Sequence, residues 1–139
     1  MINRLDILAA PEPDGATSGV WPTTLRRLDS GEFSVGGVPV GELVAEFGTP
    51  LYVLDEAEFA RRARAWKAAM GEAFANLAET DVYYAGKAFL CIAVARTAAM
   101  EGLGVDTCTE GELATALAAG VPGSRIGLHG NNKSRAEIS

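Results

Sequence analysis

The sequence contains little cysteine and almost no histidine. Its 139 residues include two cysteines, Cys91 and Cys108, and a single histidine, His129. The two cysteines do not form a Cys-x-x-Cys pair and are too few for a disulfide framework. One histidine argues against a multi-histidine metal site built within the chain, so no metal is expected. We place Cys91 inside a buried helix and Cys108 in an exposed loop without an activating neighbour.

Long apolar runs and clusters of basic residues are also missing. No run approaches the roughly 20 apolar residues of a membrane-spanning helix, and the first residues lack the basic and apolar regions of a secretory signal. Twelve Lys and Arg residues against 18 Asp and Glu residues give a net charge of −6. Such a chain is a poor partner for nucleic acid or an anionic membrane. We therefore expect a protein of the reducing cytoplasm that binds a small molecule.

Glycine and proline divide the chain into three parts. Residues 1–32 are interrupted by glycine, proline and serine and are expected to form a loosely structured N-terminal lead-in. Residues 33–50 contain short extended pieces around a glycine turn and then a two-turn helix at 41–48. Residues 51–139 alternate between strand-like apolar runs and helical patterns.

The alternation in the third part predicts a parallel sheet. Strands are expected at 51–54, 81–86, 103–106 and 125–129, each followed by a helical pattern. Helices that return the chain to the same edge after each strand build a parallel sheet. Four strands with three crossover helices correspond to about the first half of a (β/α)8 TIM-type barrel of about 250 residues. We therefore interpret the chain as the N-terminal segment of a longer α/β protein, with a compact open α/β domain as the alternative.

Capping signals and apolar stripes mark the helices. Asp55 and Glu58 have the spacing of a capping box before an apolar stripe that runs from Phe59 to Leu77. The stretch 88–100 is apolar almost all round and is expected to be a helix buried on more than one side. Capping-box spacing recurs at two further pairs, Thr109 with Glu112 and Ser134 with Glu137.

Polar residues follow the expected strands at the ends where parallel α/β folds place their functional groups. They are Asp55, Lys87, Asp106 and His129. Asp55 is explained as a helix cap. Lys87 lies between an apolar strand and an apolar helix, so its amine should be partly desolvated and nucleophilic. That suits Schiff-base chemistry with a carbonyl substrate or with pyridoxal phosphate. The alternative is that the Lys87 side chain extends to solvent and has no function.

Several blocks of the sequence resemble one family. The block VYYAGKA at 82–88 resembles the cofactor-lysine motif of the alanine-racemase-like, or fold type III, pyridoxal-phosphate-dependent decarboxylases. The segment 102–113 and the block LHGNNKS at 128–134 resemble the branch of that family that decarboxylates meso-diaminopimelate to L-lysine. The order and spacing of the blocks agree, as does GTPLYV at 48–53. Together they span residues 33–139 and correspond to about the first third of such an enzyme.

The resemblance implies a cofactor, pyridoxal 5'-phosphate, and a set of residues around it. Lys87 would hold the cofactor and, once freed, carry a proton. Asp106 would lie near the lysine and the cofactor, and His129 would line the same site. For both, a purely structural hydrogen bond is the alternative. Tyr84 is a further candidate contact, although Tyr83 and Tyr84 face opposite sides of one strand and either can be a packing residue.

In the family, other essential parts follow the region that this chain matches. They are the segments that hold the phosphate and the ring nitrogen, a C-terminal β domain, and residues that complete the site across a homodimer interface. We therefore expect the chain alone to be inactive. One alternative is a related decarboxylase of ornithine or arginine, or a racemase-like protein. Another is a non-catalytic binding module that pairs with a full-length homologue through an open sheet edge. A third is the unstable product of a degraded reading frame.

Overall fold

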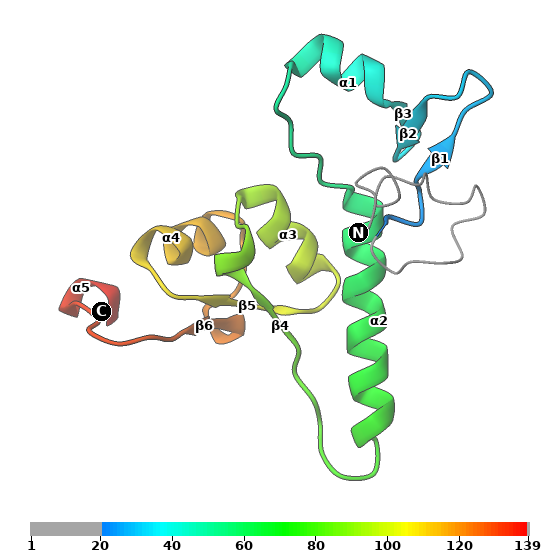
Figure 1. The fold of residues 1–139 in the computed structure, drawn as a ribbon. Helices are drawn as coiled ribbons and strands as arrows, with labels where there is room; N and C mark the ends of the chain where they lie inside the picture. The colour runs from blue at the N-terminus through cyan, green and yellow to red at the C-terminus, as the bar shows by residue number, and fades with distance from the viewer. Residues whose placement is uncertain (1–20, 139) are drawn as a thin grey trace, which may run out of the picture. The chain divides into compact units, whose positions relative to one another are not determined.

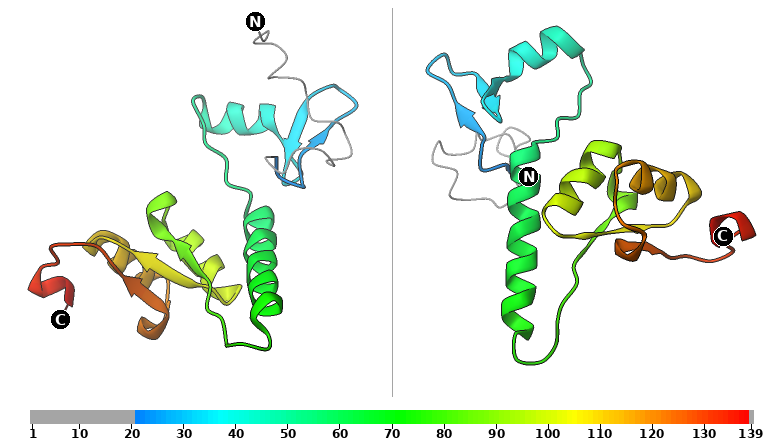
Figure 2. Two further views of the ribbon diagram at one scale, coloured as in Figure 1. Left: turned by 60° about the horizontal axis from the view of Figure 1, so that its bottom comes forward. Right: turned by 180° about the vertical axis from the view of Figure 1, so that it is seen from behind.

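The computed structural model describes residues 21–138, which form two compact units that divide between Glu58 and Phe59. Figure 1 shows the elements in chain order, and Figure 2 shows them from two further sides. Residues 1–20 of the predicted lead-in lie outside the described residues. Over residues 21–138, no helix is long and apolar enough to cross a membrane.

The first unit contains a small antiparallel sheet and one helix. Three strands pair in chain order: β1 (Arg26–Arg27), β2 (Phe33–Val35) and β3 (Val38–Pro39). The β2–β3 turn is formed by Gly36 and Gly37 with φ of 59° and 84°, values that glycine adopts without strain. Helix α1 (Val40–Phe47) follows and is capped at Gly48, as predicted. Because β1 pairs with β2, the predicted lead-in is not loosely structured at this point.

The predicted first strand, residues 51–54, is not a strand. A strand needs a neighbour that exchanges backbone hydrogen bonds with it. Within the described residues, this segment belongs to neither sheet. Tyr52 is 100% exposed, and Val53 and Leu54 are about half exposed, at 50% and 53%. The apolar composition of the segment therefore indicated a strand that does not form here.

Helix α2 (Glu56–Phe74) begins at the predicted cap. The Asp55 carboxylate accepts the backbone N–H of Glu58 at 3.0 Å. The Glu58 carboxylate in turn accepts the N–H and the hydroxyl of Thr23, at 3.2 and 2.7 Å. The bond to Asp55 satisfies a backbone N–H that a helix start otherwise leaves without a partner, and the bonds from Thr23 attach the preceding chain to the first turn.

The second unit is built on a parallel sheet. Its elements after α2 are β4 (Tyr83–Ala85), the 3-10 helix η2 (Gly86–Ala88), α3 (Ile92–Met100), β5 (Gly104–Thr107), α4 (Glu110–Ala118), the 3-10 helix η3 (Gly123–Arg125), β6 (Ile126–Leu128) and α5 (Arg135–Ile138). The strands run parallel in the order β4–β5–β6. Helices α3 and α4 lie on the same side of this sheet (Figures 1 and 2). The predicted α/β class with a parallel sheet is confirmed, with three strands in place of four.

The core lies between β5 and the helices. Val105 is completely buried, and residues of α2, α3 and α4 and of the loops before β5 and η3 pack in the same cluster. They are Ala63, Ala95, Ala98, Ala116, Ala119, Leu103 and Val121. The predicted apolar stripe of α2 is buried only near its start, because Trp66 and Leu77 further along are 65% and 80% exposed.

Helix α3 begins at Ile92 rather than at the predicted Ala88. The intervening Phe89 and Cys91 are extended, with φ of −172° and −138°. An apolar stretch without a polar face lacks the hydrophobic periodicity that marks where a helix starts. The sequence therefore could not show that the helix begins after Ala88. The end of the helix is as predicted, because Gly102 follows it with a φ of 76°.

Shortening Val105 to alanine is expected to lower the free energy of unfolding by about 2–3 kcal/mol, because it removes two buried carbon atoms and leaves a cavity. Leu117 is larger but 54% exposed, so L117A should cost less than about 1 kcal/mol. Urea unfolding followed by circular dichroism measures both. Equal losses in the two variants would contradict this position of the core.

Candidate active site

The carboxyl ends of β4, β5 and β6 meet at one end of the sheet. The register places Asp106 between Ala85 of β4 and Gly127 of β6. Residues in register have their Cβ positions on the same face of the sheet. The opposite face, centred on Val105, packs against the helices. The face that carries Asp106 therefore has small neighbours on both sides of the carboxylate.

Asp106 and His129 are paired across β5 and β6. The backbone N–H of His129 donates to the Thr107 carbonyl at 3.0 Å, which extends the ladder one residue past β6. Asp106 Oδ1 lies 2.6 Å from His129 Nδ1. A carboxylate at Nδ1 favours a proton on that nitrogen and stabilises the imidazolium when the ring is charged. The structure thus brings together two of the predicted site residues.

Lys87 lies in η2, directly after β4, and its backbone position is set by the close packing of the preceding residue, Gly86, against β5. A Cβ atom at Gly86, the residue before it, would lie 2.7 Å from the Asp106 carbonyl oxygen. Only glycine fits there without moving the end of β5. The Lys87 side chain is exposed, so the predicted desolvation is not observed. The physical reason is that β4 is an edge of this sheet. Over residues 21–138, no hydrogen bond or ion pair joins Lys87 to Asp106 or His129.

Tyr84 lies on the face of the sheet that packs against the helices, in register with Val105. Its ring contacts Phe59 edge to face with centroids 5.1 Å apart, and its hydroxyl donates to the Phe89 carbonyl at 2.6 Å. Burial raises the pKa of Tyr84 above its ordinary value. These contacts favour the packing alternative over a role in binding the cofactor.

Cys108 is the member of this site that the sequence prediction missed. Its sulfur lies 3.6 Å from His129 Nε2 and 4.0 Å from His129 Nδ1, and the residue is half-buried. The prediction of an exposed thiol without a neighbour is therefore wrong. The contact follows from the strand register, which the sequence alone does not give: Thr107 pairs with Leu128, so Cys108 and His129, the next residues, come alongside each other.

The loop after β5 is fixed from both sides. The Cys108 and Thr109 backbone N–H groups donate to Glu112 Oε2 at 2.6 and 3.2 Å, and the Glu112 N–H donates to Thr109 Oγ1. This is the predicted capping box. Lys133 Nζ donates to the Cys108 carbonyl. The thiol is thereby held beside the imidazole by the start of α4 and by the chain after β6.

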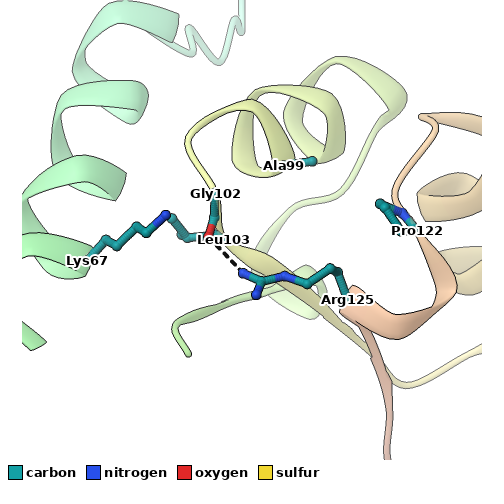
Figure 3. Close-up of a pocket in the computed structure, with 6 residues that line it drawn as sticks. All are labelled: Lys67, Ala99, Gly102, Leu103, Pro122 and Arg125. Atoms are coloured by element: carbon teal, nitrogen blue, oxygen red, sulfur yellow. Dashed lines mark hydrogen bonds between the residues drawn. The ribbon is translucent and has the colours of Figure 1, made fainter. Parts of the chain in front are cut away.

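A small cavity of about 250 Å³ lies at the amino ends of β5 and β6 (Figure 3). It is lined by Lys67, Ala99, Gly102, Leu103, Pro122 and Arg125. The Arg125 guanidinium donates to the Gly102 carbonyl at 2.8 Å and to Asp81 at 2.6 Å. Neither this cavity nor a mostly apolar one of about 500 Å³ between α2 and β4 is lined by Lys87, Asp106 or His129.

Residues 56–139 match the family described as pyridoxal-dependent decarboxylase, pyridoxal binding domain. This chain belongs to that family. Its matched part contains the sheet of the second unit and the three strand ends with their polar residues.

Several relatives are named diaminopimelate decarboxylase. The one from Mycobacterium tuberculosis is 48% identical over 120 residues, which are 86% of this chain and 26% of that protein. The one from Bacillus subtilis is 44% identical over 116 residues, 83% of this chain and 26% of that protein. The chain spans about a quarter of the length of these relatives.

A solved structure agrees with both the fold and the family. The diaminopimelate decarboxylase from M. jannaschii, in co-complex with L-lysine, has a TM-score of 0.76 and 32% sequence identity. The similarity covers 84% of this chain and 27% of that one. The three-stranded sheet with its helices is thus part of the barrel-type fold of these decarboxylases.

The residues at the carboxyl ends of the strands fit the cofactor that the family name implies. The exposed Lys87 amine is open to an aldehyde, which must reach a lysine to form a covalent bond. Ala85 and Gly127 flank Asp106 with little bulk on the face opposite the core. Asp106 and His129 supply a carboxylate and an imidazole at the same end.

The raised pKa of Tyr84 gives the chain a measurable alkaline dependence. Below a pH of about 10.0, the ordinary pKa of tyrosine, Tyr84 keeps its proton in both the folded and the unfolded state, and its contribution to the free energy of unfolding is fully present. As the pH rises from there through the higher folded pKa, the unfolded state loses its proton first and stability falls. Unfolding midpoints measured from neutral to alkaline pH should therefore decline less in Y84F than in the parent chain.

The control is Y52F, which removes the hydroxyl of a fully exposed tyrosine. It should keep the decline of the parent chain. A Y84F variant with an undiminished decline would show that the buried phenol is not its source.

Proposed function

We propose that this chain is the N-terminal part of a pyridoxal-phosphate-dependent decarboxylase that converts meso-diaminopimelate to L-lysine and carbon dioxide. The observation that carries the proposal is the 44–48% identity to proteins named diaminopimelate decarboxylase over most of this chain. The M. jannaschii enzyme forms a co-complex with L-lysine, the expected product of that reaction, which supports the same substrate class.

Lys87 is the residue proposed to hold the cofactor. It follows β4 directly, at the end of the sheet where parallel α/β folds place their chemistry. The contact between Gly86 and the Asp106 carbonyl fixes its backbone beside β5. Its amine is exposed, whereas Lys133 donates to the Cys108 carbonyl and Lys67 lies against Gly102. Lys87 is therefore the exposed one of the two lysines at this end of the sheet, whereas Lys67 is also exposed but lines the cavity at the opposite end.

Pyridoxal phosphate, when bound, supplies an electron sink for the charge left when the α-carboxylate departs. The residues of this chain position and exchange protons. Once free of the cofactor, the Lys87 amine can carry a proton between solvent and the reacting carbon. The Asp106 carboxylate holds His129 Nδ1–H and so fixes the orientation of the imidazole. Asp106 and His129 are proposed to contact the cofactor from the ends of β5 and β6.

The remainder of the proposal concerns the whole protein. Neither of the two cavities described above is lined by Lys87, and the relatives extend about four times the length of the match. We propose that segments beyond this region complete the site in a homodimer, and that the chain alone is inactive. Both described cysteines are free, which fits a protein that works in the reducing cytoplasm.

Pyridoxal phosphate added to the chain and fixed by borohydride reduction should label Lys87 severalfold above Lys67 and Lys133. The physical reason is that Lys87 is exposed and follows β4 at the carboxyl end of the sheet, the end that carries Asp106 and His129. Peptide mapping by mass spectrometry gives the share of each lysine. The matched control is K87A, in which labelling should fall to the level of the other two. Equal labelling of all three lysines in the parent chain would contradict the assignment.

The substrate is tested with the full-length polypeptide that carries this segment. Release of carbon dioxide should be faster from meso-diaminopimelate than from ornithine or arginine, with L-lysine as the product. K87A should lower the rate by about a hundred- to ten-thousandfold, as expected for loss of a proton-transferring group. A preference for ornithine or arginine would assign the chain to a related branch, and decarboxylation by the 139-residue chain alone would refute its proposed inactivity.

A further inference from the structure

Three titratable side chains lie in contact at the ends of β5 and β6. Asp106 Oδ1 lies 2.6 Å from His129 Nδ1, and Cys108 Sγ lies 3.6 Å from His129 Nε2. The imidazole is therefore bracketed by a carboxylate and a thiol. Its side chain is 55% exposed and that of Asp106 is 27% exposed, so small molecules in solvent can reach the cluster.

The geometry defines how the imidazole acts on the sulfur. Cys108 Sγ lies 3.6 Å from His129 Nε2 and 4.0 Å from His129 Nδ1. Because these two distances are similar, the sulfur contacts the ring as a whole and is not directed at the lone pair of one nitrogen. The interaction is therefore one of charge at short range. When the ring is charged, the imidazolium lies 3.6 Å from Sγ, and a cation at that distance favours a thiolate, which is the nucleophilic form of cysteine.

Two further charged groups approach Cys108, both through its backbone. The Glu112 carboxylate accepts the Cys108 N–H at 2.6 Å, and the Lys133 ammonium donates to its carbonyl. They carry opposite signs and hold opposite ends of the same peptide segment. His129 is thus the titratable side chain that contacts the sulfur itself.

We propose that Cys108 is a redox modification site, at which hydroperoxides oxidise the thiol to a sulfenic acid. This inference does not depend on the proposed decarboxylase function, because it rests on the Asp106–His129–Cys108 cluster alone. Cys91, the other cysteine, is half-buried at the N-cap of α3 and provides an internal reference.

The reaction balances with the groups present. The Cys108 thiolate attacks one oxygen of the hydroperoxide, the sulfur–oxygen bond forms and the oxygen–oxygen bond breaks. Sulfur is oxidised by two electrons and the peroxide is reduced by two. The leaving hydroxide or alkoxide takes the proton of the His129 imidazolium, which yields water or an alcohol and neutral imidazole. Asp106 stabilises the imidazolium before the step by its bond to Nδ1.

The test is the rate of sulfenic acid formation in the 139-residue chain. Hydrogen peroxide is added below saturation in the presence of dimedone, which traps sulfenic acids, and peptide mapping quantifies each cysteine. Cys108 should be labelled about tenfold faster than Cys91, and the difference should vanish in urea, where the cluster is broken. Equal labelling of the two cysteines in the folded chain would overturn the proposal.

Two variants separate the imidazole from the neighbouring ammonium. H129Q removes the imidazole that contacts the sulfur and should abolish the advantage of Cys108. K133M removes the charge at the Cys108 carbonyl and should preserve it. The proposal fails if the advantage survives H129Q, or if K133M abolishes it. Circular dichroism checks the fold of each variant. If H129Q does not fold, D106N, which keeps the imidazole but withdraws the carboxylate, must lower the advantage for the proposal to stand.

Discussion

The central constraint on the second unit is the register of β5. It is the one described strand of the parallel sheet with a partner on each side. Its residues alternate between the two faces of the sheet: Val105 and Thr107 are completely buried on the core face, and Asp106 between them lies on the opposite face. The Thr107 hydroxyl adds a bond to the Gly127 carbonyl at 2.8 Å. A slip of one residue would turn the carboxylate into the core and expose the valine to solvent.

The chemistry of the site follows from this one strand. Parallel pairing aligns the end of β4 and the end of β6 with Asp106, so that a lysine, a carboxylate and an imidazole come together at the ends of three strands that are far apart in sequence. The segments after the strands are fixed by local contacts. Gly86 packs against the Asp106 carbonyl next to Lys87, and the Cys108 N–H donates to Glu112. A site of this kind is positioned by the sheet, and its loops supply the reactive groups.

Much of this arrangement could be predicted because its signals are local. Capping boxes at Thr109 and Ser134, the glycine after α1 and the alternation of strands with helices each depend on neighbouring residues. The errors fall where a distant partner decides the outcome. Residues 51–54 have strand composition but pair with no strand in the described part of the chain, and the exposure of Lys87 depends on what covers β4.

The cysteine shows the same limit at the site. Cys108 and His129 are 21 residues apart in sequence, and their contact depends on the exact pairing of β5 with β6. Composition and spacing place both residues in loops but do not state which residue of one strand faces which of the other. Tyr84 is the converse case: alternation along β4 limits it to one face, but only the observed packing against Phe59 reveals that this is the core face.

The alanine-rich core restricts how this domain can vary. Five of the eight residues of its central cluster are alanines, from α2, from α3 and from α4 with the residue that follows it, and they allow helix and sheet backbones to approach closely. A larger side chain at Ala98 or Ala116 has no void to fill and must push its helix outward. The helices pack on that face of β5, and β4 and β6 pair with its two edges. A displaced helix would therefore shift β5 and, with it, Asp106. The core is therefore a source of remote mutations that alter the site without touching it.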